Sequence, residues 1–383
     1  MGRAEYGAAS LGRPHNLYFR FNDRQRMTTS TWFWSILALL FGLNIGSFLN
    51  VVIWRIPRGG SLISPQFSYC PHCRRRLTAI DLVPLFSFLF LGCRCRTCKQ
   101  PISWRYFTVE LLTGLLFMAL AIRFQHNAAE AVALMLFTAL LVPMTFIDLD
   151  FFAIPDSLNA LAFVFAIALD VWGIAHHEAS HALLWGWMPR SIIGALAGIL
   201  IFGFVRVAGW LWKRREAMGL GDVVLARAMG ALLVQLVLPG QNIARLFPAW
   251  VLLSCLSGMV VGIPLIYLRE KQQQLAGKQG DGEGETELNE SDEEVEESSL
   301  REQLMEIGWV LSLGDFIGYF KSKLPGKGEI AEAEPEPTIE EEGFTPEPTA
   351  IPFGPFLAIG FLAAVLFGEL LTSGYLSIAF PKK

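Results

Sequence analysis

The chain has 383 residues, of which 53% are hydrophobic and only 17% are charged, with a formal net charge of −4. A soluble globular protein carries about 25% charged residues. The charges missing here are absent from whole stretches, such as residues 27–54 and 246–268. About 20 apolar residues cross the hydrocarbon core of a bilayer as a helix. The composition therefore excludes a soluble domain and predicts an all-α polytopic membrane protein.

In chain order, the apolar stretches predict about eight membrane-spanning helices. The second contains Glu110 and the sixth contains Arg227, which makes both patterns weaker. The expected spans cover residues 31–54, 106–122, 131–147, 157–175, 191–212, 223–239, 246–268 and 352–374. They divide the chain into a polar tail (1–26), a first span (27–54), a basic loop (55–105), a six-span core (106–268), a hydrophilic insert (269–349) and a final span with the C-terminus (350–383). We expect no cleavable signal peptide, because the tail is polar and the first apolar run is too long.

Basic residues set the expected orientation. By the positive-inside rule the loop 55–105 is cytoplasmic, although five arginines in the N-terminal tail favour the opposite orientation. The basic clusters at 213–215 and 269–271 fall on the same side as the loop. The basic residues of the loop are Arg55, Arg58, Arg74, Arg75, Arg76, Arg94, Arg96, Lys99 and Arg105.

The insert is acidic at both ends. Residues 281–300 hold ten carboxylates and no basic residue, and residues 332–348 are rich in Glu and Pro. Such a composition cannot bury a core and predicts disorder. Between the acidic ends, residues 300–324 contain regularly spaced apolar side chains. This stretch is either an interfacial helix or a segment that collapses or binds a partner.

Five of the six cysteines lie in the basic loop. Cys70 and Cys73 form one CxxC pair, Cys95 and Cys98 form a second, and 21 residues separate the pairs. Four thiolates at this spacing predict a closed tetrahedral zinc site with a structural role. A cytoplasmic location disfavours disulfides. The alternatives are unligated buried cysteines, or a site in which Cys93 takes one ligand place.

Two aspartates occur at the ends of expected spans. Asp148 ends the third span and Asp222, within a GxGD sequence, begins the sixth. The chain crosses the membrane twice between them, so both carboxylates are expected on the side of the cysteine loop. Two close carboxylates at a low-dielectric boundary share a proton, so one can act as base toward water and the other as acid toward a carbonyl. The alternative is that each aspartate caps a helix.

Six blocks of sequence, taken together and in order, resemble the bacterial type IV prepilin peptidases. This family combines a leader peptidase with an N-methyltransferase and belongs to the GxGD membrane aspartic peptidases. The similarity runs from about residue 40 to 268 and resumes at 350–370. The blocks are GLNIGSFLNVVIWRIP (42–57), CPHC with DLVPLFSF and CRTCKQPIS (70–103), SWRYFTVELLTGLLF (103–117), IDLD (147–150), GLGD (219–222) and IPFGPFLAIG (351–360).

The resemblance implies a catalytic pair, Asp148 and Asp222, and zinc binding by the four paired cysteines. It implies that type IV prepilins or pseudopilins are cut after Gly at the cytoplasmic face of the inner membrane. The new N-terminal residue is then methylated from S-adenosylmethionine, with the methyltransferase residues expected around positions 46–55. Membrane lipid is the other expected partner, and nucleic acid is not. Val224 and Phe151 depart from the family, which usually has Lys and often His at these positions.

A rival motif lies between the fourth and fifth spans. His177, Glu178 and His181 have the HExxH spacing of a zinc metalloprotease helix. We expect this stretch on the membrane face opposite the aspartates, where Asp170 is the best candidate for a third ligand. Chance occurrence in a solvated or interfacial turn is the favoured interpretation. A non-enzymatic alternative is a scaffold or transporter whose aspartates serve structure or ions.

Two ionisable residues lie within apolar spans. Asp170 belongs to the fourth expected span and Arg206 to the fifth. Ionisable groups inside a membrane are usually paired or functional. One hypothesis is therefore an ion pair between them. The alternative is that Arg206 extends its side chain to the membrane interface.

Overall fold

The structure is a computed structural model that describes residues 29–63, 67–175, 189–213, 218–235, 243–262 and 352–379, with a few isolated positions between 264 and 310. Within these residues the chain is helical apart from turns and two isolated β-bridges. The long helices are α1 (Thr29–Arg55), α3 (Trp104–Arg123), α4 (Ala128–Phe151), α5 (Asp156–Ala175), α6 (Arg190–Lys213), α7 (Leu220–Gln235), α8 (Ile243–Ser257) and α12 (Gly354–Ala379).

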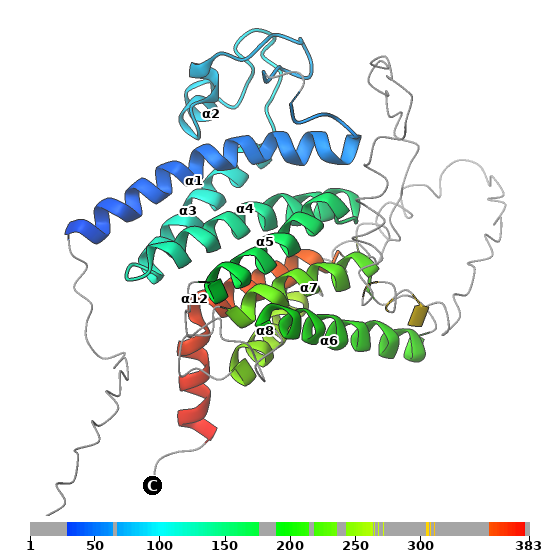
Figure 1. Ribbon diagram of the computed structural model, residues 1–383. Helices are drawn as coiled ribbons and strands as arrows, with labels where there is room; N and C mark the ends of the chain where they lie inside the picture. Colours follow the sequence, from blue (N-terminus) through cyan, green and yellow to red (C-terminus); the bar gives the residue numbers. More distant parts are fainter. Residues whose placement is uncertain are drawn as a thin grey trace, which may run out of the picture.

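The helices form one layered bundle (Figure 1). α1 packs on α3, α6 on α7, and α12 on α8, while α4 contacts α1, α3, α5 and α12. The cysteine loop lies outside α1, at the top of Figure 1, and contains the short helix α2 (Phe86–Phe90) and the 3₁₀ turn η2 (Ala79–Leu82). The expected all-helical membrane fold with a small cysteine-bearing region is confirmed.

Five of the described helices, α1, α3, α4, α5 and α6, are long and apolar enough to cross a membrane. The chain is therefore a multi-pass membrane protein. The other three expected spans coincide with helices α7, α8 and α12, but α7 has only 16 residues. At 1.5 Å per residue it is roughly 24 Å long, which is less than the hydrocarbon thickness of about 30 Å. Eight crossings therefore stay a prediction.

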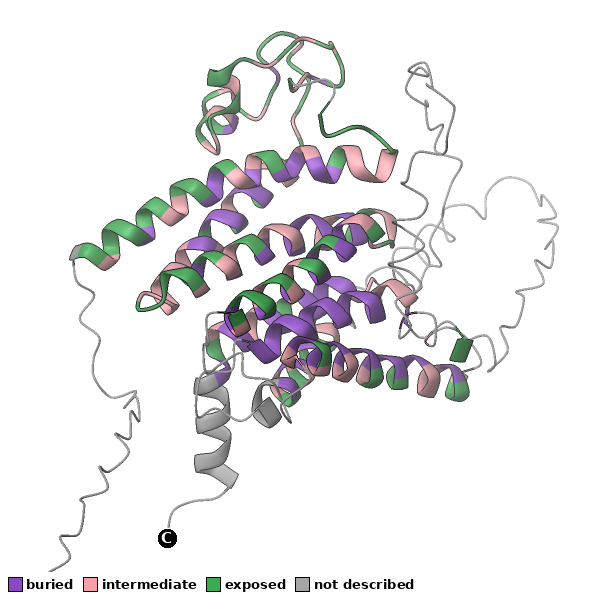
Figure 2. Ribbon diagram, in the orientation of Figure 1, coloured by how far each residue is buried: buried purple, intermediate pink, exposed green. Residues whose placement is uncertain are grey.

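α7 lies at the centre of the bundle, and most of its length is buried (Figure 2). Its contact with α6 is unusually close because glycines line it. A Cβ added to Gly194 would overlap the carbonyl oxygen of Gly230, and one on Gly198 would overlap that of Ala226. Small residues at helix contacts let backbones approach within a membrane. This packing fixes the position of Asp222, in the first turn of α7.

The proposed ion pair between Asp170 and Arg206 is wrong. The Asp170 carboxylate accepts a hydrogen bond from the backbone N–H of Ser191 at 2.8 Å, at the start of α6. Arg206 lies 15 residues further along the same helix, which at about 1.5 Å per residue is roughly 22 Å away. Arg206 does not extend to the protein surface either, because it is 2% exposed and donates to the carbonyl oxygen of Met218 at 2.7 Å.

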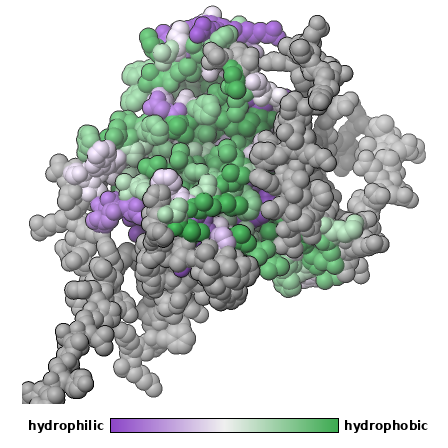
Figure 3. All heavy atoms as spheres, in the orientation of Figure 1, coloured by the Kyte–Doolittle hydropathy of each residue, from purple (hydrophilic) through white to green (hydrophobic). Residues whose placement is uncertain are grey.

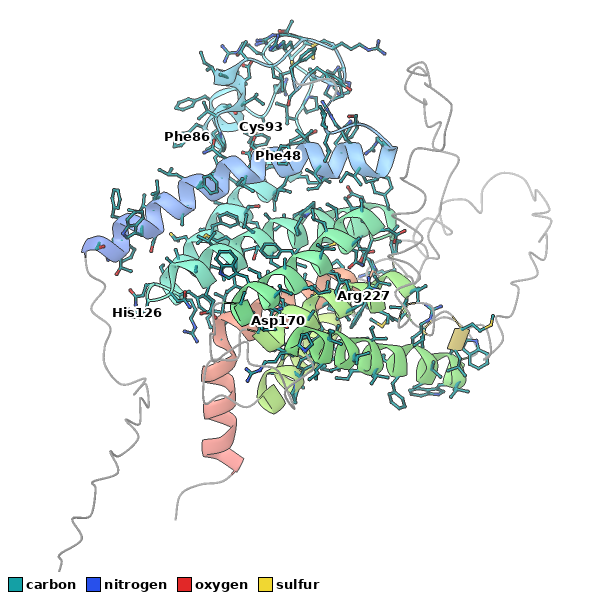
Figure 4. The ribbon with its side chains drawn as sticks, viewed as in Figure 1. Phe48, Phe86, Cys93, His126, Asp170 and Arg227 are labelled. Carbon is teal, nitrogen blue, oxygen red and sulfur yellow. The ribbon has the colours of Figure 1, made fainter. Side chains whose placement is uncertain are left out.

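The N-terminal tail, the HExxH stretch and most of the insert lie outside the described residues. Two described positions of the insert, Ile307 and Val310, pack on the bundle. A Cβ on Gly203 of α6 would lie 3.3 Å from Ile307, and the carbonyl of Val310 accepts from Arg227 of α7 at 3.4 Å. Val310 is fully buried. The backbone is helical at both positions, and these contacts attach this point of the insert to the bundle. Figure 4 shows Arg227 within the bundle.

Candidate active site

Asp148 lies in the last turn of α4, where it is 4% exposed. The helix ends because Phe152 adopts a left-handed backbone (φ 53°) and donates its N–H to the carbonyl of Asp148, and Pro155 soon follows. The side chain points toward the last helix. Its Oδ2 accepts the backbone N–H of Gly354, the first residue of α12, at 3.0 Å.

Asp222 approaches the same place from α7. It is 6% exposed, and its carboxylate interacts with the backbone N–H of Gly219, one turn earlier. It is also close enough to Asp148 for their charges to interact, and the N–H of Gly354 contacts it as well. The structure thus brings the two aspartates together. It does so because α5 and α6 carry the chain across the bundle and back between them.

Gly354 completes the site, and its role was not predicted from the sequence. A Cβ built on it would lie 2.5 Å from Oδ2 of Asp148 and 3.2 Å from Cδ1 of Ile154. Ile154 also faces Gly221, whose Cβ would lie 3.5 Å from that of Ile154. The first turn of α12 therefore fits against the carboxylate of Asp148 only because residue 354 has no side chain. The only sequence signal was its position within the IPFGPFLAIG block.

The helix-cap alternative for the aspartates is only partly correct. Asp222 interacts with backbone N–H groups around the start of its own helix, as a capping residue does. Asp148 lies at the C-terminus of α4, where the helix dipole is unfavourable for a carboxylate, and contacts the N-terminus of α12 instead. Capping does not explain why two carboxylates with little access to water are placed side by side.

A buried cation lies next to this pair. Arg206 of α6 is close enough to Asp222 for their charges to interact, and it holds the carbonyl of Met218, four residues before that aspartate. The GxGD turn is therefore fixed from the α6 side. The sequence placed Arg206 in an apolar span but did not connect it with the aspartates.

The four predicted cysteines also lie together. The Sγ atoms of Cys70, Cys73, Cys95 and Cys98 lie within 4.8 Å of one another, and the closest pairs are at 3.9 and 4.0 Å. A tetrahedral Zn–S₄ centre with bonds of about 2.3 Å requires sulfur–sulfur distances of about 3.8 Å, so the cluster fits zinc. Backbone N–H groups of Cys98 and Thr97 lower the pKa of the Cys95 thiol to about 6, whereas the pKa of the Cys98 thiol is raised to about 11 by burial and the neighbouring thiols. Cys93 is not part of this cluster.

The two cysteine pairs form a local structural repeat that was not seen in the sequence. In each, the first cysteine exchanges backbone hydrogen bonds with the residues four and five positions later. The residue after each second cysteine, Arg74 or Lys99, has positive φ. Asp81 joins the two turns, because its carboxylate binds Arg75 of the first and Arg96 of the second, each at 2.9 Å.

Burial alone would raise the pKa of Asp81. Hydrogen bonds from the backbone and hydroxyl of Thr78 and the charges of Arg75 and Arg96 outweigh burial and hold the pKa below its usual value. Asp81 is therefore ionised at neutral pH. Its position between the two turns indicates that it orients them toward each other.

Comparison with known proteins identifies the family of this chain. Residues 40–124 match the bacterial peptidase A24 N-terminal domain, and residues 135–263 match the type IV leader peptidase family. A prepilin leader peptidase/N-methyltransferase of Myxococcus xanthus is 33% identical over 342 residues, covering 88% of this chain and 91% of the relative. One from Aeromonas hydrophila is 37% identical over 268 residues, covering 63% of this chain and 84% of the relative. No solved structure matches the chain. The resemblance seen in the sequence is thereby confirmed, and the chain belongs to the type IV leader peptidase family.

Proposed function

We propose that this protein removes the leader of type IV prepilin or pseudopilin precursors with Asp148 and Asp222 as the catalytic pair. It then methylates the new N-terminus, with S-adenosylmethionine as the methyl donor. Peptidase and N-methyltransferase activities follow from membership of the family. One observation supports the choice of these aspartates above all: both carboxylates contact the same N–H group, that of Gly354.

The chemistry follows from two buried carboxylates that share one proton. The ionised carboxylate takes a proton from water while the water oxygen attacks the scissile carbonyl carbon. The protonated carboxylic acid gives its proton to the carbonyl oxygen, which produces a neutral tetrahedral intermediate. Proton transfer to the amide nitrogen then allows the C–N bond to break. The products are a leader that ends in a carboxylate and a pilin with a free amine.

The proposed location is the cytoplasmic face of the inner membrane. The basic residues of the cysteine loop support this orientation, and Asp148 and Asp222 belong to helix ends on the side of that loop. The ion pair between Arg105 of α3 and Asp150 of α4 links the base of the loop to the turn that carries Asp148. A cytoplasmic leader of a membrane-anchored precursor reaches this face without crossing the bilayer.

Zinc is the metal we propose for the four cysteines. Four thiolates leave no open coordination position, so the metal would cross-link the two turns and take no part in hydrolysis.

The methyl donor is assigned to no residues. In α1, a Cβ on Gly46 would lie 2.8 Å from the backbone of Glu110, and Asn50 donates to the carbonyl of Tyr106. Both of these positions face α3.

Cleavage and methylation measured separately on the same membranes test the proposal. We expect Asp148→Asn and Asp222→Asn to abolish cleavage of a prepilin while both variants still methylate a pilin whose leader has already been removed. Retained methylation shows that the variants fold. If either variant still cuts, the pair is not catalytic. If Glu178→Gln abolishes cleavage instead, the HExxH metalloprotease is the correct alternative. If the wild-type protein also fails to cleave, a scaffold or transporter is favoured.

A further inference from the structure

The cysteine loop exposes an apolar surface that the metal site does not use. α2 and the turn before it carry large apolar side chains that face outward, including Phe90 at 86% exposed and Ile80 at 69%. The other members of this surface are Val83, Phe86 and Leu89. Large apolar side chains gathered on a surface mark a site of contact with a partner or a membrane.

Two contacts attach this surface to a membrane-spanning helix. The buried ring of Phe88 packs against Trp104 and Phe107 of α3, with centroids 5.1 and 5.6 Å apart. The backbone N–H of Leu85 donates to the buried carboxylate of Glu110 at 2.8 Å. Leu85 makes this bond from a positive φ of 60°, which a leucine rarely adopts. The position of α2 beside α3 is therefore firmly determined.

The position of α2 along α3 defines its depth. α3 has 20 residues and, at 1.5 Å per residue, spans roughly the full 30 Å of a hydrocarbon core. Glu110 lies six residues after Trp104, or roughly 9 Å into the helix. α2 thus lies beside the first third of a membrane-spanning helix. Trp104, 61% exposed at the same level, is the kind of residue found where the bilayer meets water.

The apolar surface is continuous with the surface of the bundle that lipid contacts. Figure 3 shows hydrophilic side chains along the outer edge of the loop and hydrophobic ones from there down over the helices. Figure 4 shows Phe86 just above α1, the helix that carries Phe48, and Phe48 is 52% exposed. The same bilayer that covers Phe48 is therefore within reach of α2.

We propose that α2 and its flanking residues insert into the bilayer interface, so that phospholipid covers Phe86, Leu89 and Phe90. An apolar segment at this depth lies in the interface plane, as amphipathic anchors do. The insertion would hold the metal-binding turns against the membrane surface, on the side where the two aspartates lie. The cysteine region is then a membrane-seated element and not a freely solvated domain.

Photo-crosslinking of the full-length protein tests this proposal. The chain is placed in nanodiscs of phosphatidylethanolamine and phosphatidylglycerol with a benzophenone analogue of phenylalanine at position 90. If the variant at position 90 does not fold, the analogue is placed at position 89 instead. The zinc content of each variant is measured to check that the cysteine region is folded. Position 72 is the matched control, because His72 is exposed in the same region but within a metal-binding turn.

Illumination is expected to give phospholipid adducts at position 90 that are several-fold more abundant than those at position 72, as measured by mass spectrometry. Lipid adducts no more frequent at position 90 than at 72 would show that α2 is solvated, and the proposal would be wrong. Adducts of position 90 with polypeptide in place of lipid would also overturn it, since a protein would then cover this surface.

Discussion

The backbone N–H of Gly354 donates to Oδ2 of Asp148 at 3.0 Å, across 206 residues of chain. This contact joins the last helix to the aspartate pair, and no side chain fits between them. A Cβ at position 354 would lie 2.5 Å from that oxygen, whereas ordinary contacts begin at 3.4 Å. Any larger residue must therefore displace the carboxylate by about 1 Å, a displacement that typically costs a catalytic group about 100-fold in rate.

We therefore expect Gly354→Ala to lower kcat for prepilin cleavage by about 100-fold, with little change in KM and in the methylation of processed pilin. Gly360→Ala is the matched packing control on the same helix, because its Cβ would lie 2.7 Å from the backbone nitrogen of Ser254 on α8. Gly360→Ala should lower both activities together with the amount of folded protein. If Gly354→Ala lost cleavage and methylation equally, Gly354 would serve only the packing of α12.

The two cysteines Cys93 and Cys95 provide a second test. They are two residues apart in the same loop, but only Cys95 belongs to the four-sulfur cluster. Removal of one thiolate from a structural zinc site typically costs most of its metal affinity. We expect Cys95→Ser to lose zinc during purification and Cys93→Ser to retain one zinc per chain, as measured by atomic emission. Zinc loss in Cys93→Ser alone would place Cys93 among the ligands.

Hydropathy and spacing predicted the parts of the fold that depend on local sequence. Each expected span coincides with a helix, because a run of apolar residues must form its hydrogen bonds internally within a bilayer. Counting crossings placed Asp148 and Asp222 on one face. Counting residues along the helices also separates Asp170 from Arg206. Asp170 lies near the end of α5, whereas Arg206 lies far from the start of α6, which is the end of α6 that follows α5.

Contacts between distant elements could not be predicted in this way. The approach of Gly354 to Asp148 depends on how α12 packs against α4 and α8, and no local pattern encodes that packing. The bridge from Asp81 to Arg75 and Arg96 likewise depends on the folding of the two cysteine turns onto each other. Spacing predicted that the four cysteines lie together, but it did not predict that Asp81 links their two turns.

Asp81 should make the stability of the cysteine region depend on pH. Its pKa is lower in the folded protein than the ordinary value of 3.8, so the folded state favours the ionised form. The resulting stabilisation is fully present above the unfolded pKa and is lost as the pH falls through the folded pKa. Asp81→Asn should therefore weaken protection of amides 67–102 from hydrogen exchange at pH 7.

The difference between wild type and Asp81→Asn should begin to shrink below about pH 4, because the unfolded chain then binds a proton that the folded carboxylate, with its lower pKa, does not. The difference is lost once the pH falls through the folded pKa. Protonation of the cysteines at low pH affects both proteins, so only the difference between them reports on Asp81. A difference that stays constant from pH 7 to pH 3 would contradict the role of its charge. Arg96→Gln, which removes one of the two cationic partners, should give a smaller effect of the same sign.

Arg206 offers the last test, because it is a buried cation that contacts both the turn before Asp222 and the charge of that aspartate. Arg206→Leu leaves the carbonyl of Met218 without this donor and removes the positive charge. Removal of one partner from a buried charged contact typically costs about 3–5 kcal/mol. The effect should fall mainly on cleavage, because Arg206 lies next to the aspartates.

Arg227→Leu is the matched control, since Arg227 is also a buried arginine but stacks on the ring of Phe163 at 4.5 Å, deeper along α7 than Asp222. We expect Arg206→Leu to lower the ratio of cleavage to methylation well below that of Arg227→Leu, with both compared at equal amounts of folded protein. Arg206→Lys keeps the charge and a donor and should restore part of the ratio. Identical ratios in the two leucine variants would mean that Arg206 supports only the packing of α6 and α7.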